Sequence, residues 1–365
     1  MERRLFLLAL ILFSTSVWAG KPSYYLPHPI GWMHGLPVGE DPGWSGSFWL
    51  NFEINHGNIW NEQFDMINNK TGKKLTYSAD FEQTSLITDF GFALSESFAI
   101  GFTAPFASRG GGIMDDFIDQ FHVFIGSERF QRNSNHEFGK SYVVNTADSN
   151  QFGEKKWSAV NYVKYKAKYW LWQWQGSLEG SCDCGFSIGG QVKVPLGDSR
   201  GGMSSGHHDY TLTTHLGVPF GQNSGMWATA AFTSLGRNEI YRDWPMRRFA
   251  QMYELTMDLG YEHWGLLLQA RTESPIMNKN DLSYTYTTTD PQSQVAYRVA
   301  SGWNSLVYWR GSQSLGVRWR SLTGHQINFL IVEDWAIGSQ DSRVDHLYVN
   351  NAPDVAFVTQ FHFTF

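Results

Sequence analysis

The C-terminal residues of this chain alternate between two kinds of side chain with a period of two. Successive side chains of an extended strand point to opposite faces, so one face carries an apolar stripe made of Val355, Phe357, Thr359, Phe361, Phe363 and Phe365. The other face carries Ala356, Val358, Gln360, His362 and Thr364. This pattern is typical of a strand in the wall of a transmembrane β-barrel, with lipid on one side and a lumen on the other.

The composition of the chain agrees with a barrel. The mean hydropathy is −0.33, yet the chain contains 16 Trp, 16 Tyr and 26 Phe. A membrane helix must be apolar all round, whereas a membrane strand needs apolar side chains only at every second position. The expected fold is therefore all-β, a transmembrane antiparallel up-and-down β-barrel of about 12 strands. Long polar connections between the strands are expected at 56–75, 107–156, 237–249, 275–312 and 335–352.

The N-terminus has the three parts of a Sec signal peptide, which we assign to residues 1–19. A basic start is followed by an unbroken apolar run at 5–13, and small residues at 17 and 19 form a cleavage site. The apolar run is too short to cross a bilayer as a helix, which needs about 20 residues. We therefore expect export, a periplasmic tail or plug at residues 20–44, and a barrel over residues 45–365.

Several features bear on location and partners. Phe361, Phe363 and Phe365 resemble the terminal signal that the barrel-assembly machinery recognises in outer-membrane proteins. The expected location is the outer membrane of a Gram-negative bacterium, with lipid and lipopolysaccharide around the wall. A formal net charge of −6 gives no indication of a nucleic-acid partner. Cys182 and Cys184 are interpreted as incidental thiols or a labile disulfide, and neither a metal site nor a cofactor is expected.

Charged residues on the alternating segments indicate which face of each strand points into the lumen. Lys164, Lys166 and Lys168 share one face, and a lysine in lipid costs ~2–4 kcal/mol at the bilayer midplane. The same reasoning predicts a lumen-lining basic set of Lys164, Lys166, Lys168, Lys193, Arg271, Arg318 and Arg320. The predicted lumen-lining acidic set is Glu53, Asp89, Glu254, Asp258 and Glu273.

These charges allow two interpretations of the lumen. In the first, they line a polar, partly basic channel that passes small solutes and prefers anions. In the second, they pair with one another across the interior and leave no continuous path for water. The two sets are close to balanced in number, so the sequence leaves both interpretations open.

One long loop contains a helical pattern. Apolar residues recur at helical spacing, and aspartates lie on the other side near the positive N-terminal end; the apolar residues are Ile113, Met114, Phe117, Ile118, Phe121, Phe124 and Ile125. This predicts one short amphipathic helix in an extracellular loop. An apolar helical face needs cover, so we expect a lid or plug at the barrel mouth, with a position on the membrane surface as the alternative.

Two segments carry a resemblance to a known family. Residues 110–122, with Gly126 and Arg129, resemble a segment of a domain-of-unknown-function family of proteobacterial outer-membrane β-barrel proteins. Residues 193–198 are similar to the strand-to-loop signature of the same family. The resemblance implies an outer-membrane location and offers no activity. Its motif positions in the loop helix are Asp115, Asp116, Asp119, His122 and Arg129.

Three classes of function are open at this point. The first, which the sequence favours, is a porin-like channel for small solutes, anions among them. The second is an outer-membrane lipid-modifying enzyme. His215 and His362 fall on the lumen-facing phase without a Ser and an Asn in matching strand positions, so no catalytic residue is assigned. The third is a closed structural or adhesive barrel that presents long surface loops.

Overall fold

A computed structural model describes most of the strands and part of the connections. The described residues are 24, 31–34, 48–95, 98–110, 114, 117, 118, 120, 142–147, 166–167, 169–179, 185–196, 204–220, 223–239, 241–284, 306–337 and 355–364. Within these ranges, the side chains of residues 60–64, 78–80, 142–147, 166–167, 169–179, 284, 334–337 and 364 are not described.

The described residues are almost entirely β-structure. The strands are β1 Phe48–Asn68, β2 Lys74–Ser95, β3 Phe98–Gly110, β4 Tyr142–Ala147, β5 Lys166–Ala167, β6 Tyr169–Glu179, β7 Gly185–Pro195, β8 Asp209–Pro219, β9 Gly225–Ser234, β10 Phe249–Tyr261, β11 Trp264–Glu273, β12 Leu282–Tyr284, β13 Trp309–Arg320, β14 Gln326–Ile337 and β15 Val355–Thr364. Two short 3-10 turns are also present, η1 Gly31–Met33 and η2 Lys279–Asp281.

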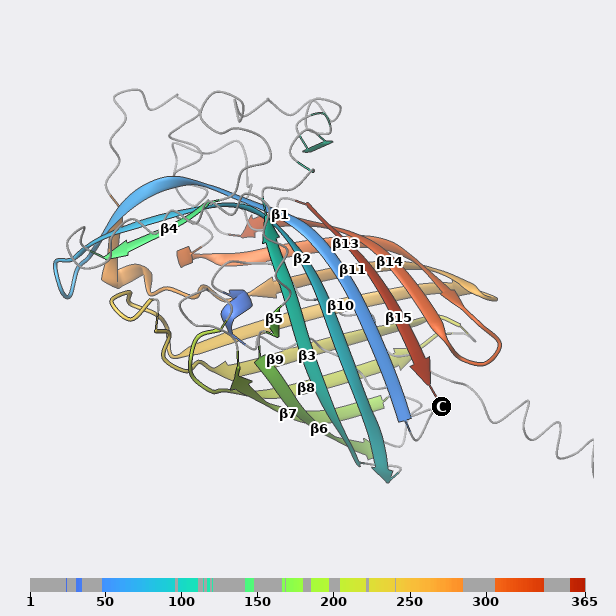
Figure 1. Ribbon diagram of the computed structural model, residues 1–365. Coiled ribbons are helices and arrows are strands. Elements are labelled where there is room, and N and C mark those ends of the chain that lie inside the picture. Colours follow the sequence, from blue (N-terminus) through green and yellow to red (C-terminus); the bar gives the residue numbers. More distant parts are fainter. Residues whose placement is uncertain are drawn as a thin grey trace, which may run out of the picture.

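The strands form one antiparallel sheet that closes on itself. The order of pairing is β1-β15-β14-β13-β11-β10-β9-β8-β7-β6-β3-β2, and β2 pairs with β1 again (Figure 1). The closing strand lies beside the first one, with Phe361 opposite Phe52. This confirms the predicted antiparallel barrel. Twelve strands form the ring in the described part of the chain, and the strand number of the whole chain stays a prediction.

In this ring the buried face is polar and the exposed face is apolar, the reverse of the arrangement in a water-soluble protein. β8 shows this most clearly: its buried face carries Asp209, Thr211, Thr213 and His215, and its exposed face carries Tyr210, Leu212 and Leu216. Large exposed apolar side chains recur in the same way on β1, β2, β9, β10, β11, β13 and β14. Water-soluble proteins rarely expose so much contiguous apolar surface, whereas a membrane barrel turns it toward lipid. Below, the buried face is called the inner face and the other the outer face.

Three of the predicted connections contain strands. β4 lies within 107–156, and β12 and the start of β13 lie within 275–312. The largest difference is at the first connection. Residues 56–75, expected to be a long polar loop, are mostly strand, because β1 runs to Asn68 and pairs with β2 as far as Ile67 opposite Lys74. The alternation was hidden by a polar run where the register shifts between Asn61 and Phe64. This extended hairpin passes beyond β3 and carries β4 and β12 beside it (Figure 1).

The extension is stabilised by an apolar cluster, which we call the mouth cluster. It joins residues of β1 and β2 to connections far away in sequence, and its buried members are Met33, Ile59, Met66, Leu75, Tyr77, Phe81, Tyr241, Trp244, Ile276, Met277, Leu282, Leu306 and Val307. Burial of these side chains stabilises the extended hairpin, since each contributes about 1.5–3 kcal/mol.

Four residues of the predicted loop helix are described. Met114, Phe117, Ile118 and Gln120 have helical backbone, and the other residues of the expected helix lie outside the described part. Met114 and Ile118 are buried against Val355 at the start of β15. In the part of the chain that the structure describes, no helix is both long and apolar enough to cross a membrane.

Candidate functional site

Residues that precede the first strand lie inside the ring. Tyr24, Trp32, Met33 and His34 are all at most 2% exposed, although none of them belongs to a strand. Trp32 and Met33 lie in η1, and His34 follows directly. Two of these residues, Tyr24 and His34, contact different parts of the wall through polar atoms, and these contacts define the candidate site.

Tyr24 contacts the inner face of the wall from β11 to β15. Its side chain packs in an apolar cluster with Leu267, Leu330, Val332, Ala356 and Val358. Its hydroxyl lies 3.3 Å from the Ser312 hydroxyl, and its carbonyl accepts a hydrogen bond of 2.8 Å from Arg271 Nη1. The wall therefore holds this residue by its ring, its hydroxyl and its backbone.

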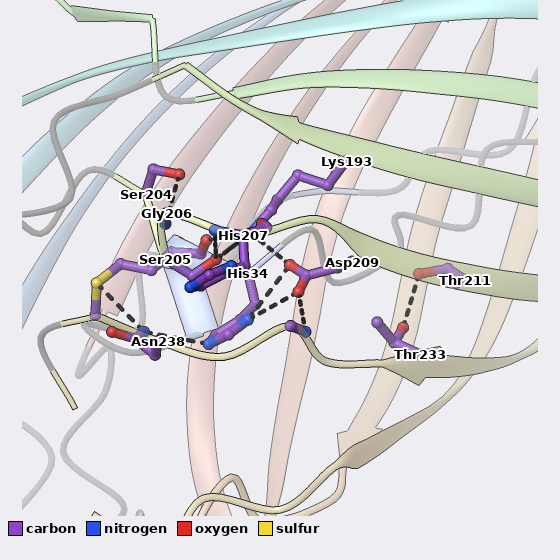
Figure 2. Close-up of polar contacts among 12 residues, drawn as sticks. His34, Lys193, Ser204, Ser205, Gly206, His207, Asp209, Thr211, Thr233 and Asn238 are labelled. Carbon is purple, nitrogen blue, oxygen red and sulfur yellow. Dashed lines mark hydrogen bonds and ion pairs between the residues drawn. The ribbon is translucent and has the colours of Figure 1, made fainter. Parts of the chain in front are cut away.

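His34 lies in a polar cluster formed by β7, β8, the connection before β8 and the connection after β9 (Figure 2). We call it the His34 cluster; its members are His34, Lys193, Ser205, Asp209 and Asn238. His34 Nδ1 lies 3.3 Å from both carboxylate oxygens of Asp209, and Nε2 lies 3.3 Å from Asn238 Nδ2. A neutral imidazole fits this arrangement, with Nδ1–H donating to the carboxylate and Nε2 accepting from the amide.

Asp209 is the centre of this cluster. Lys193 Nζ lies 2.6 Å from one carboxylate oxygen, and the backbone N–H of Gly236 donates to the other at 2.6 Å. Lys193 Nζ also donates to the carbonyl of Met33 at 3.1 Å and to Ser205 Oγ at 2.5 Å. The side chains of Lys193 and Asp209 are fully buried. Buried charges require such partners, so the wall and the N-terminal residues complete each other's hydrogen bonding.

The cluster contains a hydroxyl beside a lysine, a pair that can act as nucleophile and base in other settings. Here Ser205 Oγ donates to the carbonyl of His207, and the lysine faces the Asp209 carboxylate. A lysine held as the cation of an ion pair accepts no proton from a hydroxyl. The geometry fits a structural contact that holds the N-terminal residues against the wall better than it fits a catalytic site.

A second set of buried charges, the Arg271 cluster, lies beside Tyr24. Arg271 Nη2 is 2.5 Å from Glu273 and Nη1 is 3.8 Å from Glu254, while Arg310 Nη2 is 2.5 Å from Glu273. Arg318 forms a separate buried pair of 3.0 Å with Asp258. Three of the four residues in the predicted basic set whose side chains are described therefore face carboxylates: Lys193, Arg271 and Arg318.

Some of the other residues singled out in the sequence are described by the structure, and the rest lie outside the description. Glu53 and Asp89 are buried on the inner face and accept hydrogen bonds from side chains, at 3.1 Å from Gln360 and 2.7 Å from Thr103. Arg320 is partly buried. The remaining predicted residues lie outside the description, wholly or in their side chains: Lys164, Lys166, Lys168, Asp115, Asp116, Asp119, His122, Arg129, Cys182, Cys184 and Phe365. Phe361 and Phe363 of the proposed assembly signal are partly buried.

Between the two charged clusters the inner face is polar and largely neutral. Hydroxyl and amide side chains pair with each other across the strands: Thr211 with Thr233 at 2.9 Å, His215 with Thr229 at 3.0 Å, and Gln269 with Thr256 at 3.0 Å. These groups can exchange hydrogen bonds with one another or with a passing polar solute.

Sequence reasoning missed His34, Tyr24, Ser205 and Asn238. Residues 20–44 were expected to form a tail or a plug, but no pattern in that segment singled out a histidine. His34 and Asp209 are 175 positions apart. The available signal was Lys193 itself, because a lysine predicted to point inward needs a buried carboxylate and Asp209 begins the next strand.

The chain has weak likenesses to several solved structures. The COG4313 outer membrane channel from Pseudomonas putida F1 has 8% sequence identity and a TM-score of 0.44, over 91% of this chain and 98% of that chain. A Pseudomonas aeruginosa FadL homologue has 8% identity and a TM-score of 0.38, over 94% and 98% of the two chains. The P. putida toluene transporter TodX has 8% identity and a TM-score of 0.38, over 87% and 89%. At such values these likenesses carry no information on function.

The search of curated proteins found no match to the chain. A family model described as "Protein of unknown function (DUF3187)" matches residues 44–286, a range that includes both segments in which the sequence resembles an outer-membrane family. Because the match spans more than half of the chain, the chain belongs to the DUF3187 family.

Proposed function

We propose that this protein is an outer-membrane channel for small polar solutes and that its own N-terminal residues hold it shut. The observation that carries the proposal is the position of His34, inside the ring and bonded to Asp209 and Asn238. A residue outside the barrel strands that completes a buried charge network in the wall closes part of the cross-section. Such a contact can be released without unfolding the barrel, because the wall keeps its own strand pairing.

The character of the inner face supports neutral solutes over anions. Lys193, Arg271 and Arg318 are each paired with a carboxylate, so their charges are compensated where they stand. The hydroxyl and amide groups between these pairs offer both donors and acceptors, as a small hydroxylated solute requires. We therefore expect weak charge selectivity once the N-terminal residues leave the lumen.

Location and biogenesis belong to the same proposal. Residues 1–19 act as the export signal, and Phe361, Phe363 and Phe365 act as the assembly signal. The exposed apolar outer face supports a membrane location, with lipid and lipopolysaccharide around the wall. Export followed by barrel assembly places such a chain in the outer membrane of a Gram-negative bacterium.

Solute entry into proteoliposomes tests the proposal. The mature chain is reconstituted, and swelling is followed with uncharged sugars and with charged solutes of similar size. His34→Ala should swell faster than the unchanged chain, since the wall loses one of its contacts with the N-terminal residues. Uncharged and charged solutes should enter at similar rates. Thr233→Val is the matched control, because Thr233 lies near the cluster but its hydroxyl pairs with Thr211, which is not a member of the cluster. Equal, negligible swelling for all three correctly folded proteins contradicts a channel.

A further inference from the structure

The outer face of the wall carries a polar cluster that the channel does not use. His56 on β1 and Thr84 on β2 lie directly opposite each other, and so do the next outward pair, Asn58 and Glu82. The neighbouring residues Glu53 and Asn55 are buried on the inner face. Because side chains alternate along a strand, His56 and Asn58 point to the outer side. These four residues are called the outer cluster.

The donor and the acceptor of each hydrogen bond in the outer cluster can be assigned. Glu82 Oε2 lies 3.1 Å from His56 Nε2, and His56 Nδ1 lies 2.8 Å from Thr84 Oγ1. A carboxylate only accepts, so Nε2–H donates to Glu82 and Nδ1 is left as the acceptor for the Thr84 hydroxyl proton. A hydroxyl, a histidine base and a carboxylate that orients the base form the arrangement by which serine and threonine hydroxyls are activated as nucleophiles.

Asn58 provides an independent observation. It is 0% exposed, and neither its amide nitrogen nor its amide oxygen has a hydrogen-bond partner among the described residues. A buried polar group without a partner costs about 1–3 kcal/mol, and native structures contain few of them without a reason. An amide N–H beside an activated hydroxyl is the kind of donor that stabilises the oxyanion of acyl transfer.

The surroundings indicate which substrate could reach the cluster. One step along the same face lies the apolar pair Ile54 and Leu86, exposed by 46% and 37%. His56 is eight residues from the start of β1 at Phe48, or roughly 26 Å along the strand. At a strand tilt of about 40° this is roughly 20 Å in height, in the outer part of an apolar band about 25 Å tall. An acyl chain lying along Ile54 and Leu86 would present its ester group at the level of Thr84.

Two described residues of the loop helix, Met114 and Phe117, lie next to the outer cluster and the outer face of β15. The backbone N–H of Met114 donates to Glu82 Oε1, the carboxylate oxygen that does not face His56. Phe117, which is half exposed, has its ring 6.0 Å from the ring of Phe357 on the outer face of β15. The helix thus fixes the carboxylate and adds apolar surface next to it. His56 remains 30% exposed, so the base is accessible from outside the barrel.

We propose that the outer cluster hydrolyses the ester bond of an ester-linked acyl chain of an outer-leaflet lipid. Thr84 Oγ attacks the ester carbonyl carbon while its proton passes to His56 Nδ1, and the Asn58 amide donates to the resulting oxyanion. The carbon–oxygen bond to the lipid alcohol then breaks, and His56 returns the proton to the leaving oxygen. Water, deprotonated by His56, then attacks the acyl carbon. The bond between this carbon and Thr84 Oγ breaks, His56 returns the proton to Thr84 Oγ, and the fatty acid leaves. Glu82 is a positioning residue throughout.

A purely structural role explains less. Glu82 could serve only to anchor the loop helix, but this contact uses one carboxylate oxygen and leaves the bond to His56 and the unpaired Asn58 unexplained. The inner face offers a direct comparison, since His215 Nδ1 lies 3.0 Å from Thr229 Oγ1 in a buried pair that faces no lipid. This second pair supplies matched control variants on the same protein.

The test is fatty-acid release by the full mature chain in mixed micelles of phosphatidylethanolamine, in lipopolysaccharide, and with a p-nitrophenyl ester of a long fatty acid. Phosphatidylethanolamine and lipopolysaccharide both carry ester-linked acyl chains, so comparing the first two substrates shows which lipid is hydrolysed. Thr84→Val should lose about a hundredfold or more of the activity, and Thr84→Ser should retain it. Thr229→Val and His215→Gln should be unchanged. Glu82→Gln should lower kcat with little change in KM, and Glu82→Asp should recover part of it.

Folding is checked separately by the difference in gel mobility between boiled and unboiled samples. Mass spectrometry after a lipophilic fluorophosphonate should show a single adduct on Thr84 that is absent in Thr84→Val. Absence of ester release in all three arms by a folded wild-type chain overturns the proposal. The same conclusion follows if folded Thr84→Val is as active as the wild type. Neither result bears on solute entry through the lumen.

Discussion

His34 and His56 are close in sequence but lie on opposite sides of the barrel wall. His34 is 1% exposed and sits between Asp209 and Asn238 inside the ring. His56 is 30% exposed and sits between Glu82 and Thr84 on the outer face. Each imidazole bonds one carboxylate, so the residue types alone do not separate the two sites. The two sites differ in their position relative to the wall. The inner site is enclosed by protein, whereas the outer site is partly exposed on the face that a membrane barrel turns toward lipid.

The largest effect is expected at the carboxylate on the inner side. Asp209→Asn leaves Lys193 buried without its counter-charge, and breaking a buried ion pair from one side costs about 3–5 kcal/mol. The free energy of unfolding in lipid vesicles, followed by urea titration and gel mobility, should fall by that amount. Replacing both partners, with Lys193→Met and Asp209→Leu, should recover much of the loss. A double variant as unstable as Asp209→Asn contradicts the importance of the unpaired charge.

The two histidines should then differ in what their removal does. His34→Ala leaves Asp209 and Asn238 each short of one buried partner, so it should lower the free energy of unfolding by about 1–3 kcal/mol. His56→Ala removes a partly exposed partner from Glu82, which keeps its contact with Met114, and should cost less than about 1 kcal/mol. Equal losses for the two variants, measured under the same conditions, would remove the distinction between the sites.

A smaller effect is expected at the other contact of the N-terminal residues. Tyr24→Phe removes the hydroxyl that faces Ser312 but keeps the ring and the carbonyl that Arg271 contacts. The expected loss is about 0.5–1.5 kcal/mol. Proteolysis of the N-terminal residues in folded protein should speed up in step with this loss. An unchanged cleavage rate would show that the Tyr24 hydroxyl does not help to hold the segment.

The smallest effect is expected at a surface ion pair. Lys70 Nζ lies 2.6 Å from Asp281, but the lysine side chain is 68% exposed. Exposed pairs contribute about 0–1 kcal/mol and are screened by salt. Asp281→Asn should therefore change the free energy of unfolding by less than about 1 kcal/mol, and the difference should vanish at high salt. A loss as large as that of Asp209→Asn would contradict the role assigned to burial.

The sequence was most informative where the cause is local. Alternation and the cost of charges in lipid can be judged strand by strand, and they correctly predicted the antiparallel barrel. They also assigned Glu53, Asp89, Lys193 and Arg271 to the lumen. All four are buried, and a lumen-lining role stays a prediction. The same alternation identifies the outward-facing positions of β1, which include His56 and Asn58. The family was predicted separately, from the resemblance of residues 110–122 and 193–198.

The remaining features depend on long-range register and packing. The pairing of His34 with Asp209 joins residues 175 positions apart, and no local pattern encodes it. The outer cluster needs the exact partnering of His56 with Thr84, which the β1–β2 register sets. The extension of that hairpin was missed because its stability comes from a cluster with Trp244 and Leu306, far away in the chain.

The most direct test of a channel held shut by its N-terminal residues is single-channel recording in planar bilayers. The wild-type chain, His34→Ala and Thr233→Val are recorded side by side after each is shown to be folded. The wild type and Thr233→Val should be closed for most of the recording, and His34→Ala should show frequent, long openings with little preference for anions. Indistinguishable traces from the wild type and His34→Ala would contradict the proposed role of His34.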